Sequence, residues 1–136
     1  MSIALDASMA MAWCFEDERN PESDVVLDRI ITKGAFVPSL WKIEVANSLQ
    51  VAIRRKRIDR QYRDLALARL QNLPIETDPE TSLHVWSAGI ELADQYGLAL
   101  YDAVYLELAI RRQIPLATLD KALFEAGRQA GLPPLP

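Results

Sequence analysis

Short apolar runs alternate along this chain with longer segments in which apolar side chains recur at helical spacing. An apolar run of three to five residues is too short for a helix and is typical of a buried strand. The pattern therefore predicts strands at residues 3–5, 35–37 and 114–118, with a weaker candidate at 73–77. Residues 131–133 could add a further strand at the sheet edge.

The segments between these runs predict helices, and several of their ends carry capping or stop residues. Asn20-Pro21 opens one helix and Gly34 stops it, Asp59 begins another, and Gly97 ends a third. The expected helices cover residues 7–17, 20–33, 38–57, 59–70, 79–96, 100–110 and 120–129. In the fourth helix Tyr62, Leu65, Ala66 and Leu70 should face inward, and in the fifth Leu83, Trp86, Ile90 and Ala93 share helical spacing.

Strands that alternate with helices imply a parallel sheet that is covered by helices on both faces. The predicted fold class is α/β, a three-layer α/β/α sandwich around a parallel sheet of four to five strands. The helix over 100–110 is largely apolar and should be central. With 136 residues and no repeat, linker or low-complexity segment, we expect a single domain over residues 1–136.

Composition narrows the class of protein and the kind of site. Hydrophobic residues make up 50% and charged residues 25%, as in soluble globular proteins. No apolar run approaches the ~18 residues of a membrane helix, and no basic region precedes the apolar start, so a cytoplasmic protein without a membrane partner is expected. The lone Cys14 excludes a disulfide framework and a cysteine zinc site, and the lone His84 argues against a histidine-rich metal site.

Four acids stand out because their surroundings are apolar. Asp6 and Asp120 each end a predicted strand and open a helix, Glu44 lies on the first turns of a helix after a strand, and Asp102 lies within the apolar helix. In parallel sheets, ligands bind beyond the carboxyl ends of the strands. Charge in apolar surroundings is costly unless it is compensated, and clustered acids repel one another. A divalent cation removes that conflict, so we predict a carboxylate-lined Mg²⁺ or Mn²⁺ site.

Each acid also has a simpler interpretation. Asp6 and Asp120 could only cap the helices that follow them, and Glu44 could be a solvated border position. Asp102 would need an arginine partner or a backbone cap. Three nearby polar residues also have two interpretations each. The hydroxyls of Ser8 and Thr118 could bond the carboxylates or a metal-bound water, or they could make only local backbone contacts. Asn47 could orient Glu44 or contact substrate, or it could be only a polar helix position.

Basic residues gather in one stretch although the net charge is −4. Arg54, Arg55, Lys56 and Arg57 are consecutive, Arg60 and Arg63 follow, and Arg111-Arg112 form a second pair. Such a stripe is either a set of phosphate contacts for RNA or a solvated helix end, and the sequence leaves both open.

The order of these motifs resembles the PIN-domain nucleases, and within them the VapC-like toxins of toxin–antitoxin pairs. The resemblance spans nearly the whole chain. It rests on Leu5-Asp6-Ala7-Ser8, Pro38-Ser39-Leu40 with Glu44-Val45-Ala46-Asn47, Leu100-Tyr101-Asp102-Ala103 with Tyr105-Leu106, and Leu116-Ala117-Thr118-Leu119-Asp120-Lys121.

The resemblance implies an acidic quartet that binds one or two Mg²⁺ or Mn²⁺ ions and catalyses RNA hydrolysis. It also implies a homodimer that is blocked by a cognate antitoxin protein. By resemblance the quartet is Asp6, Glu44, Asp102 and Asp120, with Ser8, Asn47 and Thr118 as supporting positions.

The resulting hypothesis is a metal-dependent endoribonuclease that acts as a toxin. Two alternatives stay open: a non-catalytic binding module that keeps the fold, and an aspartyl-phosphate phosphotransfer protein. The second usually has another acid two residues after the first, where this chain has Ser8. Aromatic residues left over after the core is filled would mark a protein interface, and the candidates are Trp13, Phe15, Trp41 and Trp86.

Overall fold

The computed structural model describes residues 1–135 and contains a sheet of four parallel strands in the order β3-β2-β1-β4. The strands contain two or three residues each. They are β1 (Ile3–Leu5), β2 (Ala35–Val37), β3 (Ile75–Thr77) and β4 (Leu116–Ala117). The predicted α/β class with a parallel sheet is therefore confirmed.

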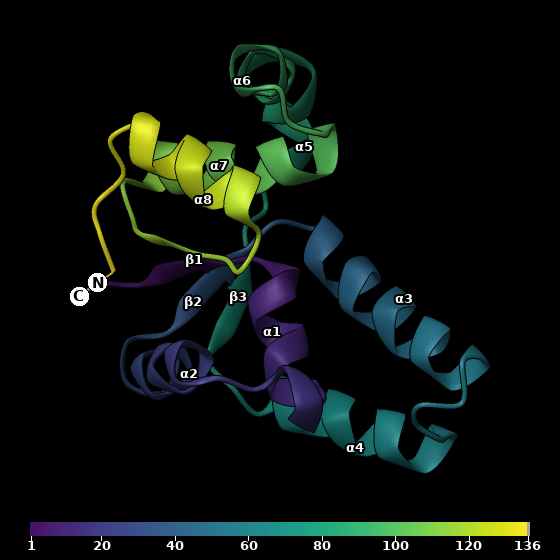
Figure 1. The fold of residues 1–136 in the computed structure, drawn as a ribbon. Helices are drawn as coiled ribbons and strands as arrows, with labels where there is room; N and C mark the ends of the chain where they lie inside the picture. The colour runs from purple at the N-terminus through teal and green to yellow at the C-terminus, as the bar shows by residue number, and fades with distance from the viewer. Residues whose placement is uncertain (136) are drawn as a thin grey trace.

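Helices cover both faces of the sheet (Figure 1). α7 and α8 lie on one side, α1 and α2 on the other, and α3 and α4 run as a neighbouring pair that extends away from the sheet. The bounds are α1 (Ala7–Cys14), η1 (Glu16–Glu18), α2 (Pro21–Lys33), α3 (Leu40–Arg54), α4 (Arg60–Gln71), α5 (Thr81–His84), η2 (Val85–Gly89), α6 (Ile90–Tyr96), α7 (Leu100–Arg112) and α8 (Lys121–Gln129). None of the described helices is long and apolar enough to cross a membrane.

The core forms where α7 packs on β1 and β4. Ile3 and Leu5 of β1, and Tyr105 and Leu106 of α7, are completely buried. Full burial of one such aliphatic side chain stabilises the fold by about 1.5–3 kcal/mol. The prediction that this helix is central is confirmed.

Two helices end earlier than predicted, and the backbone shows why. After Cys14 the chain becomes extended at Phe15, so α1 stops three residues before the predicted end and a 3-10 turn, η1, follows. α3 stops at Arg54 because Lys56 adopts a left-handed conformation with φ of 60°. The amides of Lys56 and Arg57 then bond back to carbonyls of the last turn, which is a Schellman ending.

Three further predictions are wrong in detail. Leu65 is 47% exposed and does not face inward. Residues 131–133 form no strand, because the chain turns at Gly131 with φ of 78° and lies against α8. The helix over 79–96 is interrupted by a π-helical turn, η2, and Trp86 within that turn is 86% exposed.

Candidate functional site

Asp6 lies where β1 ends, and its backbone amide bonds to the carbonyl of Ala117 at 3.0 Å. Its side chain is 5% exposed, and Oδ2 accepts hydrogen bonds from the Ser8 hydroxyl at 2.6 Å and the Thr118 hydroxyl at 2.7 Å. The side chain makes no capping bond to α1, so the capping interpretation of Asp6 is wrong. Two hydroxyls therefore hold one oxygen of a buried carboxylate that has no cationic partner among residues 1–135.

The same hydroxyls organise the loop after β4. The Leu119 amide donates to Ser8 Oγ at 3.0 Å, and the Asp120 amide donates to Thr118 Oγ1 at 3.0 Å. Asp120 does cap α8, because its Oδ2 accepts from the Leu123 amide at 2.9 Å. Its capping interpretation is thus confirmed, and its other oxygen accepts no side-chain hydrogen bond within the described chain.

Glu44 is half-buried on the second turn of α3 and receives a hydrogen bond from the Tyr105 hydroxyl. From the sequence, we did not predict Tyr105 as part of the site. Its position one turn after Asp102 on α7 could have indicated that the two side chains share a helix face. Asn47 lies one turn beyond Glu44, is exposed, and makes no hydrogen bond to Glu44. Glu44 is therefore held from α7 and not from its own helix.

Asp102 lies on the first turn of α7 and is half-buried. Within residues 1–135 its side chain has neither an arginine partner nor a capping bond, so neither simpler interpretation holds. The four acids differ in depth: Asp6 is buried, Glu44 and Asp102 are intermediate, and Asp120 is exposed. The exposure of the four acids therefore increases from Asp6, at the end of β1, to Asp120.

The acids of this group, hereafter the acidic cluster, disfavour one another's charge. Burial raises the pKa of Asp6 above its usual value, and its two hydroxyl hydrogen bonds do not cancel that effect. Burial also raises the pKa of Glu44, and the charges of Asp6 and Asp102 add to the increase. The pKa of Asp102 rises through burial and the charges of Asp120 and Asp6. No cation contributes to any of these shifts.

The donor set of the acidic cluster fits a hard divalent cation. Each carboxylate keeps at least one oxygen that accepts no side-chain hydrogen bond from the described residues. Across residues 1–135, no three His, Cys, Asp or Glu side chains stand close enough to form a ready-made cage. Mg²⁺ does not require one, because it usually keeps several waters and binds through one or two carboxylates.

The Arg111-Arg112 pair belongs to a second group of charges, which the sequence did not predict. Both guanidinium groups bond to Asp78, with N–O distances of 2.7 and 2.8 Å, and Arg111 also pairs with Glu107 at 2.8 Å. The Asp78 side chain is completely buried. These arginines are therefore neither a solvated helix end nor a free phosphate-binding pair, and the Arg112 guanidinium also stacks on Phe36 at 3.8 Å.

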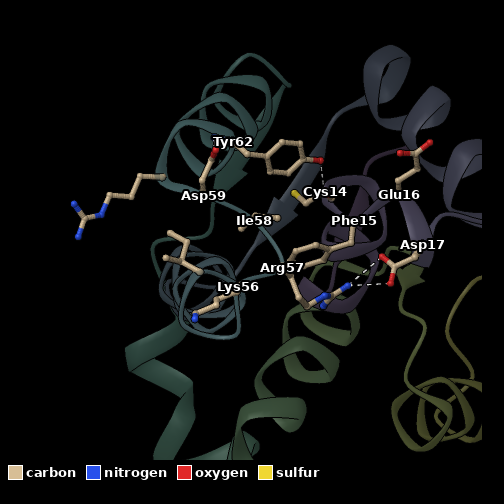
Figure 2. A pocket seen from close by; sticks show the side chains of 11 residues that line it. Cys14, Phe15, Glu16, Asp17, Lys56, Arg57, Ile58, Asp59 and Tyr62 are labelled. Carbon is tan, nitrogen blue, oxygen red and sulfur yellow. Dashed lines mark hydrogen bonds and ion pairs between the residues drawn. The ribbon is translucent and has the colours of Figure 1, made fainter.

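The other basic residues divide into engaged and free. Figure 2 shows Arg57 turned back toward Asp17, and its Nη2 lies 3.0 Å from Asp17 and 3.3 Å from Glu18. The Arg57 guanidinium also lies 4.5 Å from the centre of the Phe15 ring. Arg57 lines a pocket of about 1070 Å³ that contains none of the four acids. Arg54, Arg55 and Lys56 are exposed and form no ion pair among the described residues.

The remaining candidate side chains have structural roles. Cys14 is buried, and burial raises the pKa of its thiol to about 11, so it is not a nucleophile. His84 contacts Glu80 at 3.3 Å. Phe15 is buried, and the Trp13 indole donates to the Ser23 carbonyl at 2.8 Å, so neither is a base-stacking platform.

Comparison with known proteins gives a family match and matches among the solved structures. The family described as PIN domain matches residues 3–129. The solved structure titled FitAcB from Neisseria gonorrhoeae has a similar fold, with a TM-score of 0.65 and 16% sequence identity, over 94% of this chain and 94% of that chain. At this identity the likeness concerns the fold alone. No curated protein matches the sequence.

Proposed function

The chain belongs to the PIN-domain family, and from this premise we propose that it is a metal-dependent endoribonuclease that hydrolyses RNA phosphodiester bonds as the toxin of a toxin–antitoxin pair. One observation carries the proposal. Four carboxylates of unequal depth repel one another beside the sheet, and no cation among the described residues compensates them. Clustered carboxylates without an internal cationic partner are typical of a site that binds an external cation.

In the proposed mechanism Asp6, Glu44, Asp102 and Asp120 would hold one or two Mg²⁺ or Mn²⁺ ions. A bound ion of this kind lowers the pKa of a coordinated water and stabilises the leaving oxygen. Ser8 and Thr118 orient Asp6 through the hydrogen bonds to its Oδ2, which leaves Oδ1 as the oxygen for the ion. Asn47, which is exposed one turn beyond Glu44, would contact the substrate.

The acidic cluster would also take up a proton, and basic residues would contact the phosphates of the RNA. A carboxylate oxygen of the acidic cluster that does not contact an ion would accept the proton of the attacking water. Histidine acid–base cleavage is not available, because the chain has one histidine and that residue contacts Glu80. Arg54, Arg55 and Lys56 have the exposure and charge to hold the RNA backbone, and we place Arg57 at the edge of this surface because it is already paired.

The direct test uses purified wild-type protein, Asp102→Asn and the matched control Asp94→Asn. Asp94 is an exposed acid of α6 with no hydrogen bond among those of the described chain. We expect cleavage of RNA that requires Mg²⁺ or Mn²⁺ and stops with a chelator. Asp102→Asn should abolish it and Asp94→Asn should not. Full ribonuclease activity in Asp102→Asn would refute the site, and labelling of an Asp by a phosphodonor would favour the phosphotransfer alternative.

An antitoxin would compensate the acidic cluster in another way. A lysine or arginine from a partner's C-terminal segment could supply the missing positive charge and displace the metal. We propose that a small DNA-binding protein, encoded beside this one, inhibits it in this manner. Co-expression followed by size-exclusion chromatography with light scattering should give a stable complex without nuclease activity. A protein that runs alone and stays active beside that neighbour would refute the proposal.

The exposed face of α5, η2 and α6 supports the proposed homodimer. Leu83, Trp86 and Ile90 occur at helical spacing and are 71%, 86% and 42% exposed. None is charged, so the face can pack against a copy of itself without repulsion. Trp86→Asp should shift sedimentation from dimer to monomer, and Phe124→Asp, at a 55% exposed site on α8, should not. A wild-type protein that sediments as a monomer at all concentrations would refute the dimer.

A further inference from the structure

Tyr105 is a completely buried side chain that connects the core to the acidic cluster through its hydroxyl group. It lies on α7 one turn beyond Asp102, with 0% exposure. Its hydroxyl donates to Glu44 Oε1, which connects α7 with α3. A buried tyrosine hydroxyl requires a partner, and here that partner is a carboxylate of the site.

Glu44 has the longest side chain of the four acids. A glutamate side chain has three rotatable torsions, and it loses rotamer entropy when it is held in place. Its carboxylate is half-buried near the like charges of Asp6 and Asp102, so entropy and repulsion both favour its movement toward solvent. A hydrogen bond from a rigid, buried donor opposes this movement.

We propose that Tyr105 is a positioning residue that holds the Glu44 carboxylate in the acidic cluster by fixing Oε1, so that Oε2 is the oxygen offered to the cation. The proposal rests on the proposed function, because it assigns a cation to the cluster. It mirrors the arrangement at Asp6, where hydroxyls occupy Oδ2 and leave Oδ1. Outer hydrogen-bond partners of this kind commonly change metal affinity 10–100-fold.

A control for loss of a tyrosine hydroxyl is present in the same chain. Tyr62, on α4, donates its hydroxyl to the backbone carbonyl of Cys14, away from the four acids (Figure 2). Tyr62→Phe and Tyr105→Phe both remove one such hydrogen bond and keep the ring. They differ in that only Tyr105 has a carboxylate of the acidic cluster as its partner.

The experiment measures Mn²⁺ affinity by electron paramagnetic resonance, with Mn²⁺ alone as the probe. Wild type should bind Mn²⁺, Tyr105→Phe should bind it about tenfold more weakly, and Tyr62→Phe should match wild type. In a Glu44→Gln background, the further change Tyr105→Phe should have no additional effect, because the hydroxyl acts through Glu44. Urea unfolding of each variant checks that it is folded.

A second measurement keeps the proposal testable if Tyr105→Phe does not fold. The chain has four tyrosines, so incorporated 3-fluorotyrosine gives few fluorine resonances. The Tyr105 resonance should move when Mg²⁺ is added to wild type and should not respond in Glu44→Gln. An unmoved resonance, or equal Mn²⁺ affinities of wild type and Tyr105→Phe, would overturn this inference alone. Failure of wild type to bind Mn²⁺ would overturn the proposed function and this inference with it.

Discussion

Two groups of carboxylates in this molecule, one around Asp78 and one around Asp6, have opposite electrostatics. Asp78 follows β3 as Asp6 follows β1, and both side chains are buried. Burial alone would raise the pKa of Asp78, but the hydrogen bonds from Arg111 and Arg112 outweigh it and hold the pKa at about 2. Asp6 receives hydrogen bonds from neutral groups and none from an arginine or lysine of the described chain, and burial raises its pKa.

The difference separates a charge that is paired inside the fold from one that we propose to be functional. Asp78 and its arginines compensate one another inside the fold, and they connect the end of β3 to the end of α7. The acidic cluster has no such cationic partner among the described residues, and in the proposed function a cation from outside supplies the positive charge. The same position after a parallel strand therefore holds a paired carboxylate in one case and a carboxylate with a proposed metal-binding role in the other.

The largest expected effect comes from breaking the compensated group. Asp78→Asn leaves two arginines without their buried partner and should cost about 3 kcal/mol of unfolding free energy in urea titrations. Because the folded-state pKa of Asp78 is depressed from 3.8 to about 2, its stabilisation is present above pH 3.8 and is lost as pH falls toward 2. The stability difference between wild type and Asp78→Asn should shrink over that range. If Asp78→Asn lowers the unfolding free energy at pH 7 by less than about 1 kcal/mol, the arginines do not stabilise Asp78 as described.

A smaller and opposite effect is expected at the acidic cluster. Asp102 has a raised pKa, so in metal-free protein its ionisation destabilises the fold as pH rises above the unfolded value of 3.8. Asp102→Asn should therefore match wild type at low pH and exceed it near neutral pH by about 1 kcal/mol or less. Added Mg²⁺ should stabilise wild type and not the variant. A variant that is less stable than wild type at pH 7.5 in a chelator would show that Asp102 has a stabilising partner.

The sequence predicted the acidic cluster better than the Asp78 group, and the reason is local context. Asp102 stands out because the helix around it is apolar, and Asp6 follows a clear strand. Asp78 follows a strand so weak that Thr77-Asp78-Pro79 resembles an ordinary loop. Its partners come from the end of α7, more than thirty residues later, and no spacing rule connects them.

The sequence also could not predict which helix faces are buried and which are exposed. The spacing of Leu83, Trp86 and Ile90 shows that the side chains share a helix face, but not whether that face meets α7 or solvent. The π-helical turn η2 shifts the register within this segment, and Gly89 is the buried residue there. The early end of α3 depends on a left-handed Lys56, a conformation that lysine rarely adopts.

The smallest expected effect concerns the basic surface and separates free arginines from engaged ones. Replacing Arg54, Arg55 and Lys56 by Gln should weaken RNA binding and lower the slope of log affinity against log salt by about 0.7 for each phosphate that is no longer neutralised. Arg57→Gln should change the slope less, because Arg57 is paired with Asp17 and Glu18. Filter binding at several salt concentrations measures both. Equal slopes for wild type and the triple variant would identify the stripe as a solvated helix end.

We propose that only the acidic cluster attracts a cation from outside. Substoichiometric Mn²⁺ added to ¹⁵N-labelled protein tests this in one spectrum, because Mn²⁺ broadens the amide resonances nearest its binding site. The amides of Asp6, Asp102 and Asp120 should broaden first, those of Asp78 and Arg111 should broaden later, and Asp102→Asn should remove the early broadening. Broadening that is strongest around Asp78, or spread evenly over the exposed acids, would contradict it.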